Sequence, residues 1–312
     1  MENTQLDHIV ITEGDTQKRL DRLLTEHFPT HSRTYFQYLI ETGSVLVNGV
    51  QVKKREKQKV GDEIEICFIL TPEIALEPED IPLDIIYEDE HFLAINKKAG
   101  MVVHPAAGHP SGTFVNALLY HTKKLKEEFS LDLRPGIVHR LDKDTTGILL
   151  GAKTLEAHQR LIALFSQRKI EKKYLAISIG SPKEGTLSAP IARHETHRKE
   201  MCIDLVRGKE AISEIKILAS KENLSLVEVG LITGRTHQIR VHLKHLKTPI
   251  AGDPVYGSLS FNKSHGVLRQ MLHAHKLTLI HPFTGKELKL EAPIPSDMLE
   301  LINKSQLNYP PS

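Results

Sequence analysis

Residues 139–147 read His-Arg-Leu-Asp-Lys-Asp-Thr-Thr-Gly, and the interpretation of the larger part of the chain starts from this stretch. It follows a turn signal, Arg134-Pro135-Gly136, and leads into the apolar run Ile148-Leu149-Leu150. The pattern therefore predicts that Asp142 is held in a short loop at the mouth of a β-strand, with Arg140 close by. On placement alone, such an aspartate is more often a turn former or a surface ion-pair partner than a catalyst.

A second stretch, residues 233–243, reads Thr-Gly-Arg-Thr-His-Gln-Ile-Arg-Val-His-Leu and predicts the start of a helix. Its cations, Arg240 among them, would share a face different from the apolar one. An arginine opposite an apolar stripe is most often simply exposed. A helix start rich in arginine and histidine is also a ready site for phosphate or carboxylate. The predicted buried stripe consists of Ile239, Leu243 and Leu246.

Residues 172–179 alternate as a β-strand does, with Leu175 and Ile177 on one face. Tyr174 is predicted to point the other way, away from this apolar face. A tyrosine in a strand is usually a packing residue. Its position opposite the apolar stripe leaves a functional role open.

At 312 residues the chain can hold one large domain and one small one. Hydrophobic residues make up 40% and charged residues 26%, as in an ordinary globular protein. The net charge of +2 does not indicate a nucleic-acid partner, so that argument must come from local clusters. The two cysteines, Cys67 and Cys202, lie far apart, which excludes a disulfide scaffold and favours a reducing compartment.

The N-terminus lacks the basic start and apolar run of a signal peptide. No apolar stretch approaches the ~20 residues that span a bilayer. We therefore expect a cytoplasmic protein with no membrane partner.

Residues 17–75 have the pattern of a small α+β domain. Apolar residues recur at helical spacing from Leu20, and Ser32 is placed to cap a second helix. Alternating runs then meet at Asn48-Gly49, the strongest short hairpin signal. Asp21 is predicted to lie on the exposed face of the first helix. The domain order predicted from the sequence is 17–75 for this domain, 76–83 for a linker, 84–302 for the large domain and 303–312 for a tail.

The small domain also carries a basic run on its predicted hairpin. A solvated surface is the simpler interpretation of such a run, and phosphate contacts are the alternative. The run consists of Lys53, Lys54, Arg55, Lys57 and Lys59.

Longer strings resemble a known family. HRLDxxTxG around Asp142 and TGRTHQIRVHL over 233–243 closely resemble two signatures of the RluA-type pseudouridine synthases. The segments around 104–121 and 135–138 are most similar to the large-subunit ribosomal RNA pseudouridine synthase D subgroup of that family. One departure is Lys98, where family members commonly carry proline. Further matching segments are 96–100, 103–105, 252–257 and 272–274.

This resemblance implies an α+β fold, with a catalytic domain built on a mixed, mainly antiparallel β-sheet with flanking helices and loops. It also implies the isomerisation of uridine to pseudouridine in RNA. Asp142 would be the catalytic residue, either as nucleophile at C1′ or as base at the sugar. Arg240 would pair with it, since a buried carboxylate needs an opposite charge to stay ionised. Tyr174 would stack on the target uracil and assist proton transfer at C5.

The resemblance implies RNA contacts as well. Because a stacked uridine hides its sugar edge, the nucleotide should be flipped out, and Arg140 would occupy the vacated space. His139, Arg235 and His237 are expected to contact RNA beside it.

In the small domain, Arg19-Leu20-Asp21, Ser32-Arg33 and residues 43–49 resemble the S-four type of RNA-binding domain. That resemblance implies phosphate contacts by Arg33, Lys53, Lys54 and Arg55. Arg-Leu-Asp therefore occurs twice in the chain, and only the copy at 140–142 lies in the longer motif.

The expected partner is large-subunit ribosomal RNA, including RNA within pre-ribosomal particles, and we expect a monomer. No cofactor is expected, because the reaction consumes nothing and no nucleotide-binding fingerprint occurs in the sequence. No metal is expected at His242-x-x-His245 or His273-x-His275, which lack a carboxylate or cysteine at zinc-motif spacing. Two alternatives stay open: a synthase acting on transfer RNA or another ribosomal RNA site, and a non-catalytic RNA-binding ribosome-assembly factor.

Overall fold

The structure, a computed structural model, divides the chain into two compact units. The first contains residues up to 80 together with 104–111 and 115–135, and the second contains the rest. The N-terminal part of the first unit thus ends inside the segment 76–83. The structure describes residues 5–16, 18–28, 31, 33–53, 55–68, 76–105, 109, 111–122, 135–197 and 200–307.

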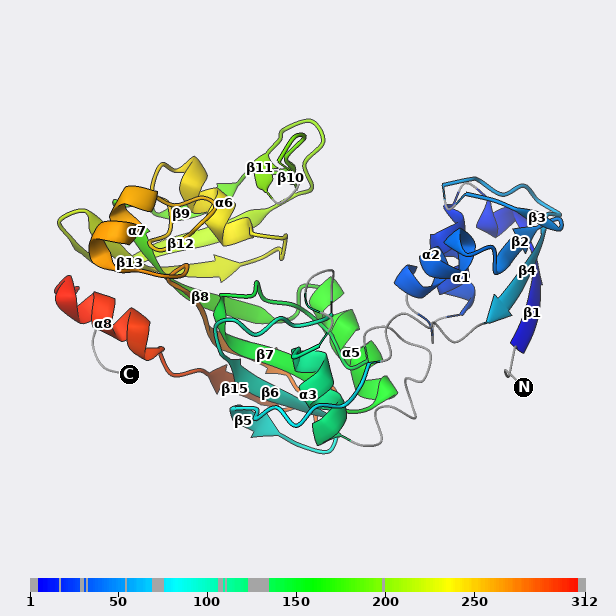
Figure 1. The fold of residues 1–312 in the computed structure, drawn as a ribbon, viewed down its shortest axis with the longest axis horizontal. Helices are drawn as coiled ribbons and strands as arrows, with labels where there is room; N and C mark the ends of the chain where they lie inside the picture. Colours follow the sequence, from blue (N-terminus) through cyan, green and yellow to red (C-terminus); the bar gives the residue numbers. More distant parts are fainter. Residues whose placement is uncertain are drawn as a thin grey trace. The chain divides into compact units, whose positions relative to one another are not determined.

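The first unit is a small α+β structure in which two helices cover one face of a four-stranded antiparallel sheet (Figure 1). The strand order is β1-β4-β2-β3, and the apolar sides of the helices and of β4 form one core. Asn48 and Gly49 join β2 to β3 with φ of 52° and 76°, which confirms the predicted hairpin turn. The elements are β1 (Gln5–Val10), η1 (Glu13–Asp15), α1 (Leu20–His27), α2 (Arg33–Glu41), β2 (Val45–Val47), β3 (Val50–Gln51) and β4 (Glu63–Phe68).

The prediction that Asp21 lies on an exposed helix face is wrong. Its side chain is fully buried and accepts hydrogen bonds from Arg19, from Arg33 at 2.9 Å and from Gln37. Burial alone would raise the pKa of this carboxyl, but the bonds from Arg33, Gln37 and Arg19 outweigh it and lower the pKa. Asp21 therefore joins the start of α1 to α2. A predicted cap on α2, Ser32, lies outside the described residues.

The second unit is built on a nine-stranded sheet in the order β5-β6-β7-β14-β8-β13-β12-β9, with β15 paired to β14. Every neighbouring pair is antiparallel except β7 and β14, which are parallel. The predicted α+β fold with a mixed, mainly antiparallel sheet is thus confirmed. The strands are β5 (Ile85–Glu88), β6 (Phe92–Lys97), β7 (Thr146–Ala152), β8 (Glu171–Ile179), β9 (Gly185–Ser188), β12 (Ile212–Lys221), β13 (Leu224–Leu231), β14 (Leu272–Ile280) and β15 (Glu287–Glu291).

Helices and one further hairpin lie around this sheet, at the places labelled in Figure 1. Thr154 caps α5 as predicted, because its hydroxyl accepts the backbone N–H of Ala157 at 3.2 Å. The helices are α5 (Leu155–Ser166), α6 (Gln238–His245), α7 (Leu259–His265) and α8 (Ser296–Lys304), the hairpin is β10 (Ile191–Arg193) with β11 (Met201–Ile203), and α3 (Phe114–His121) spans the division between the units.

Strand β8 lies near the middle of the sheet, between β14 and β13. Residues 174–178 are buried, so both faces of this part of the strand are covered by protein. The alternation in its sequence correctly places Tyr174 on the face opposite Leu175 and Ile177. Tyr174 is buried within the protein rather than turned to solvent.

Gly147 is the second residue of β7, and its backbone has a φ of 104°, which favours glycine. A Cβ atom there would lie 2.2 Å from the carbonyl oxygen of Ala274 in β14. The glycine therefore allows β14 to lie directly against the start of β7. This close contact fixes the point at which the loop that contains Asp142 joins the sheet.

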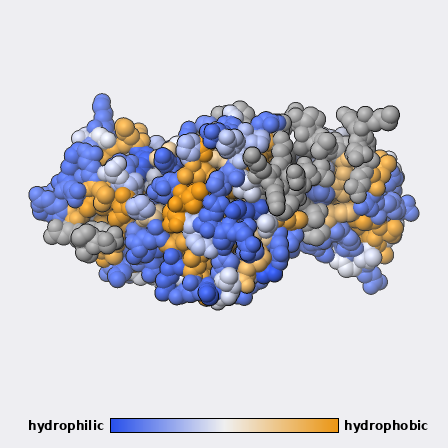
Figure 2. Space-filling model, turned by 90° about the horizontal axis from the view of Figure 1, so that it is seen from below, coloured by the Kyte–Doolittle hydropathy of each residue, from blue (hydrophilic) through white to orange (hydrophobic). Residues whose placement is uncertain are grey.

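The surface seen in Figure 2 is mainly hydrophilic, and its hydrophobic residues are exposed in separate patches. Within the described part of the chain, no helix has the length and apolar character required to cross a membrane.

Candidate active site

Asp142 lies in a short loop before β7, as predicted, and this loop is anchored from several sides. The amine of Lys97, at the end of β6, donates to the carbonyl oxygens of Lys143 at 2.8 Å and Met101 at 3.0 Å. The backbone N–H of Gly100 also donates to Lys143 O, at 3.1 Å. Burial lowers the pKa of Lys97 to about 7, against the opposing charges of nearby carboxylates. Lys97 thus stabilises the loop through the residue next to Asp142.

Arg240 lies between two carboxylates. Its Nη1 donates to Asp142 Oδ2 at 2.8 Å, while Nε and Nη2 donate to the two oxygens of Asp253 at 2.7 and 2.9 Å. Arg240 and Asp253 are 4% and 1% exposed, so this pairing takes place inside the protein. The sequence pattern on α6 places Arg240 on a polar face, and that face turns out to be buried against Asp253.

The charges of this group support one another. Burial alone would lower the pKa of Arg240, but the bonds and charge of Asp253 and Asp142 raise it above its usual value. Burial alone would raise the pKa of Asp253, yet Arg240 and the backbone N–H groups of Tyr256 and Val255 lower it. Arg240 and Asp253 therefore remain charged, and the planar guanidinium fixes where Asp142 sits.

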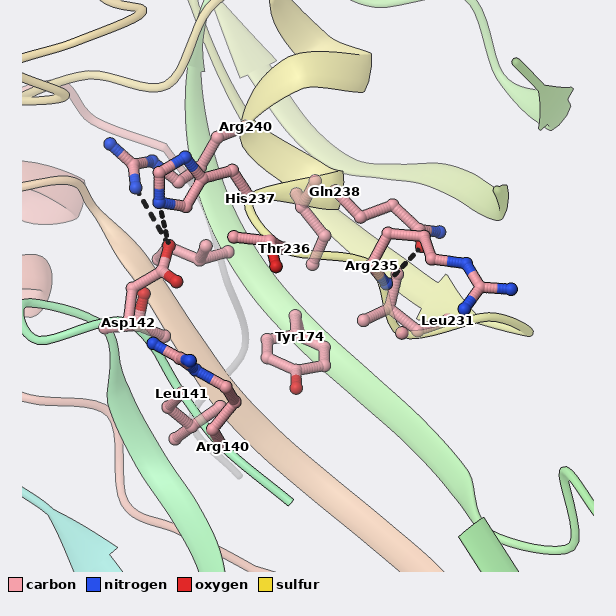
Figure 3. A pocket seen from close by; sticks show the side chains of 14 residues that line it. Arg140, Leu141, Asp142, Tyr174, Leu231, Arg235, Thr236, His237, Gln238 and Arg240 are labelled. Atoms are coloured by element: carbon pink, nitrogen blue, oxygen red, sulfur yellow. Dashed lines mark hydrogen bonds and ion pairs between the residues drawn. The ribbon is translucent and has the colours of Figure 1, made fainter. Parts of the chain in front are cut away.

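Tyr174 projects from β8 into the same pocket as Asp142 (Figure 3). Burial, together with the negative charge of Asp142, raises the pKa of its hydroxyl well above the usual range. The ring is thus a neutral aromatic surface at any physiological pH. It can stack on a planar ligand that enters the pocket.

His237 precedes α6 in a left-handed conformation, with φ of 57°, which is uncommon for a residue other than glycine. Its Nδ1 lies 2.8 Å from the hydroxyl of Tyr256, which in turn accepts the backbone N–H of Met201 at 2.8 Å. Its Nε2 lies 3.8 Å from Asp142 Oδ2. Burial lowers the pKa of His237, against the charge of Asp142, which favours a neutral imidazole beside the carboxylate.

The pocket itself is formed by the loop around Asp142, by three strands of the sheet and by the segment that leads into α6. It combines a carboxylate, cations and an apolar wall, so it can hold a planar polar group next to an ionised acid. Its lining residues are Arg140, Leu141, Asp142, Thr145, Tyr174, Leu231, Gly234, Arg235, Thr236, His237, Gln238, Ile239, Arg240 and Leu272.

Of the residues expected to contact RNA beside the site, the structure places three at the pocket and one away from it. Arg140 is exposed at the rim, His237 lies beside Asp142, and Arg235 Nε donates to the carbonyl of Glu210 at 2.9 Å. His139 does not line the pocket. Its Nε2 accepts the backbone N–H of Leu150 at 2.9 Å, which fixes the ring against the sheet.

In the first unit, Arg33 is half exposed and pairs with Asp21, as described above. Lys53 and Arg55 are exposed on the segment that follows β3. Lys54 lies outside the described residues.

One histidine of each sequence pair, His242 and His273, has polar partners within the fold. His242 contacts the hydroxyl of Ser213 at 2.9 Å and the carbonyl of Ala189 at 3.0 Å. His273 contacts the hydroxyl of Thr146 at 2.9 Å, and so helps to hold the first residue of β7. Across the residues that the structure describes, no group of three or more His, Cys, Asp or Glu side chains could hold a metal ion.

Comparison with known proteins identifies the family. Residues 91–245 match the family model described as RNA pseudouridylate synthase. The chain is 42% identical over 311 residues to "Ribosomal large subunit pseudouridine synthase D" of Escherichia coli K12, covering 96% of this chain and 94% of that protein. The chain belongs to the RNA pseudouridylate synthase family. The matched segment contains Asp142, Tyr174 and Arg240.

Other relatives of the family give the same result. The protein of the same name from Xanthomonas campestris is 38% identical over 312 residues, covering 96% of this chain and 93% of that protein. Among solved structures, human RNA pseudouridylate synthase domain containing 4 superimposes with a TM-score of 0.58 at 27% identity, covering 73% of this chain and 94% of that one. The protein is therefore an RNA pseudouridine synthase.

Sequence reasoning missed Asp253 and Tyr256 as parts of the site. Both lie in the Gly252–Gly257 stretch, which was noted only as a family-like string. Asp253 holds Arg240, and the Tyr256 ring lies 4.9 Å from the Arg240 guanidinium carbon. The missed signal was a carboxylate in another family-like motif. A buried arginine that faces a single, only partly buried acid requires further compensation of its charge.

We predict that Asp253→Asn lowers the single-turnover rate of pseudouridine formation by on the order of a hundredfold, because the guanidinium loses the carboxylate that aims it at Asp142. Since Asp253 acts through Arg240, the pH profile of the rate should change as well. Asp204→Asn is the matched control: Asp204 also accepts two bonds from one arginine, Arg207, but lies outside the pocket. Equal rates in both variants would show that Asp253 does not position Arg240.

Proposed function

We propose that this RNA pseudouridine synthase modifies uridines in large-subunit ribosomal RNA, and that Asp142, Arg240 and Tyr174 carry the reaction. The observation that carries the proposal is the ion pair between Asp142 and a buried Arg240 in a pocket that also contains an aromatic ring. The printed names of the bacterial relatives support large-subunit ribosomal RNA as the substrate. We place this activity in the cytoplasm, on free RNA or on pre-ribosomal particles.

The reaction exchanges one bond at the sugar for another. The bond from N1 of uracil to C1′ breaks, the base turns within the pocket, and C5 bonds to C1′. The proton on C5 is lost and N1 gains one, so the overall proton count does not change. No group is transferred to or from a second molecule. Binding and orientation of the uridine therefore provide most of the rate enhancement.

Asp142 supplies the charge at the sugar. As a nucleophile, Asp142 bonds to C1′ while uracil leaves. When C5 of uracil then bonds to C1′, the bond between Asp142 and C1′ breaks. As a base it removes a proton from the sugar while uracil leaves, and it returns that proton to the sugar when C5 bonds to C1′. In both cases the carboxylate must be ionised, and Arg240 stabilises this form at 2.8 Å.

The base must leave the RNA stack to reach Asp142. Tyr174 provides a flat apolar surface on which the freed uracil can stack while it turns. Arg140, exposed at the rim beside Asp142, is placed to fill the gap that the flipped nucleotide leaves.

The first experiment tests substrate and chemistry together. In cells lacking this gene, carbodiimide labelling should show that pseudouridines are lost at large-subunit positions, and the wild-type gene should restore them. Asp142→Asn should restore none, since its rate falls by about 10⁴-fold or more when the charge is removed. An unchanged map in the deletion strain would refute the substrate, and restoration by Asp142→Asn would refute the catalytic role.

Arg240→Met should lower the single-turnover rate by about 10²- to 10³-fold, because Asp142 loses its counter-charge. The double variant with Asp142→Asn should lose little beyond the single Asn variant, since residues that act as a unit are not additive. Independent, additive losses would show that the two residues serve separate steps.

Tyr174→Phe keeps the stacking ring and loses the hydroxyl, whereas Tyr174→Ala loses both. We expect the alanine variant to lose about 1–3 kcal/mol of substrate binding, and the phenylalanine variant to lose much less. Binding is measured by filter retention of a substrate RNA, and the rate by single turnover. Wild-type behaviour of both variants would mean that Tyr174 only packs within β8.

We further propose that the domain at 17–75 is an S-four-type RNA-binding domain that adds affinity through Arg33, Lys53, Lys54 and Arg55. The exposure of Lys53 and Arg55 on one segment supports this role. Neutralising Lys53 and Arg55 should weaken RNA binding and reduce the salt slope by about 0.7 per lost contact with a single strand. The single-turnover rate at saturating RNA should persist; its complete loss would mean that the domain helps to form the active site.

A further inference from the structure

Strand β8 carries two adjacent lysines in opposite electrostatic surroundings. Lys173 lies 3.3 Å from Glu171 Oε1 and 3.8 Å from Glu228 Oε1, and these carboxylates raise its pKa. Lys172 must point to the other face, because neighbouring residues of a strand alternate. That face is the one that carries Tyr174, two residues further along.

The register of the sheet identifies this face as the catalytic one. Tyr174 is paired with Val229 on β13, so Leu231, two residues beyond Val229, shares its side of the sheet. Tyr174 and Leu231 both line the pocket that contains Asp142. Lys172 is therefore on the active-site side, about 7 Å from Tyr174 along the strand.

Lys172 is half-buried without a compensating acid. In the part of the chain that the structure describes, no carboxylate oxygen lies within 4.0 Å of its Nζ. Its charged end lies 6.0 Å from the ring centre of Phe165, which stacks on His139. Burial, and then the positive charge of Arg168, lowers the pKa of Lys172. A bound anion stabilises the charged form of an ammonium group in such surroundings. It offsets both the loss of solvation on burial and the repulsion from Arg168.

A second pocket is lined by this lysine and shares Leu231 with the pocket of Asp142. Its charged lining residues are the cations Arg168, Lys169, Lys172 and Lys173 and the acids Glu171 and Glu214. Glu171 is the acid already paired with Lys173. Arg168 is itself neutralised in part by Glu210, at 2.5 Å. Among the cations that line this second pocket, Lys172 is thus the half-buried one for which the described part of the chain supplies no carboxylate within 4.0 Å.

We propose that Lys172 binds a phosphate of the RNA backbone next to the target uridine, with Lys169 and Arg168 extending the same track. The inference rests on the proposed function, since the anion is part of the RNA that Asp142 acts on. The separation between Lys172 and Tyr174 is close to the reach of one nucleotide step. A base stacked on Tyr174 thus places its neighbouring phosphate at the ammonium group, which binds phosphate as a point charge.

The test compares Lys172→Met with Lys173→Met on the shortest ribosomal RNA stem–loop that the wild-type protein converts. Lys172→Met should bind this RNA about tenfold more weakly, as expected for one charge-assisted hydrogen bond, and its salt slope should fall by about one. Lys172→Arg should restore most of the affinity and the slope. Lys173→Met should match the wild type, because its charge is already paired.

A neutral methylphosphonate in the RNA identifies the contact directly. Placed singly at the phosphates on either side of the target uridine, it should weaken wild-type binding at one position. At that position the methylphosphonate should not weaken RNA binding by Lys172→Met any further. Equal losses in both proteins at every position, or equal affinities of Lys172→Met and Lys173→Met, would overturn the proposal.

The failure of this proposal and the failure of the proposed function give different results. If the wild-type protein converts no ribosomal RNA, the proposed function fails, and the phosphate site fails with it because it rests on that function. If the wild-type protein is active and Lys172→Met still binds normally, only the phosphate site fails.

Discussion

The site depends on one buried arginine that is shared by two carboxylates. Arg240 uses two of its nitrogens on Asp253 and a third on Asp142, so its orientation is set from inside the fold before any ligand arrives. A lone buried carboxylate would tend to take up a proton, and a lone buried guanidinium would be costly. Asp253 and Arg240 therefore stabilise each other's charge, and the fixed fork of the guanidinium sets the direction of Asp142 at the edge of the pocket.

The same arrangement explains why several distant segments meet here. The loop of Asp142 is held by Lys97 at the end of β6, and Arg240 comes from α6. Asp253 and Tyr256 come from the turn that follows α6, and Tyr256 connects His237 to the β10–β11 hairpin through Met201. Hydrogen bonds join each of these segments to the next, so that the pocket is preorganised for a transition state whose charge forms at the sugar.

Local features of the fold could be predicted from the sequence because their physical causes are local. The turn before β7, the Asn48-Gly49 hairpin and the Thr154 cap each depend on a few neighbouring residues, and each was predicted correctly. Asp21 was predicted wrongly because its burial depends on Arg33 and Gln37, which are 12 and 16 residues away. The position of Asp253 beside Arg240 depends on how the chain turns after α6, and helix periodicity carries no information about that turn.

The central place of β14 has a consequence for how the protein becomes active during its synthesis. This strand enters the sheet between β7 and β8, although it is made more than a hundred residues after β7, and Thr146 and His273 are 127 residues apart. Until the ribosome has released β14, the strand that follows the Asp142 loop and the strand that carries Tyr174 have no shared neighbour. Pairing across such a separation in sequence is slow, because loop-closure entropy is lost before the contacts form. The chain therefore acquires its active site only after β14 has been made.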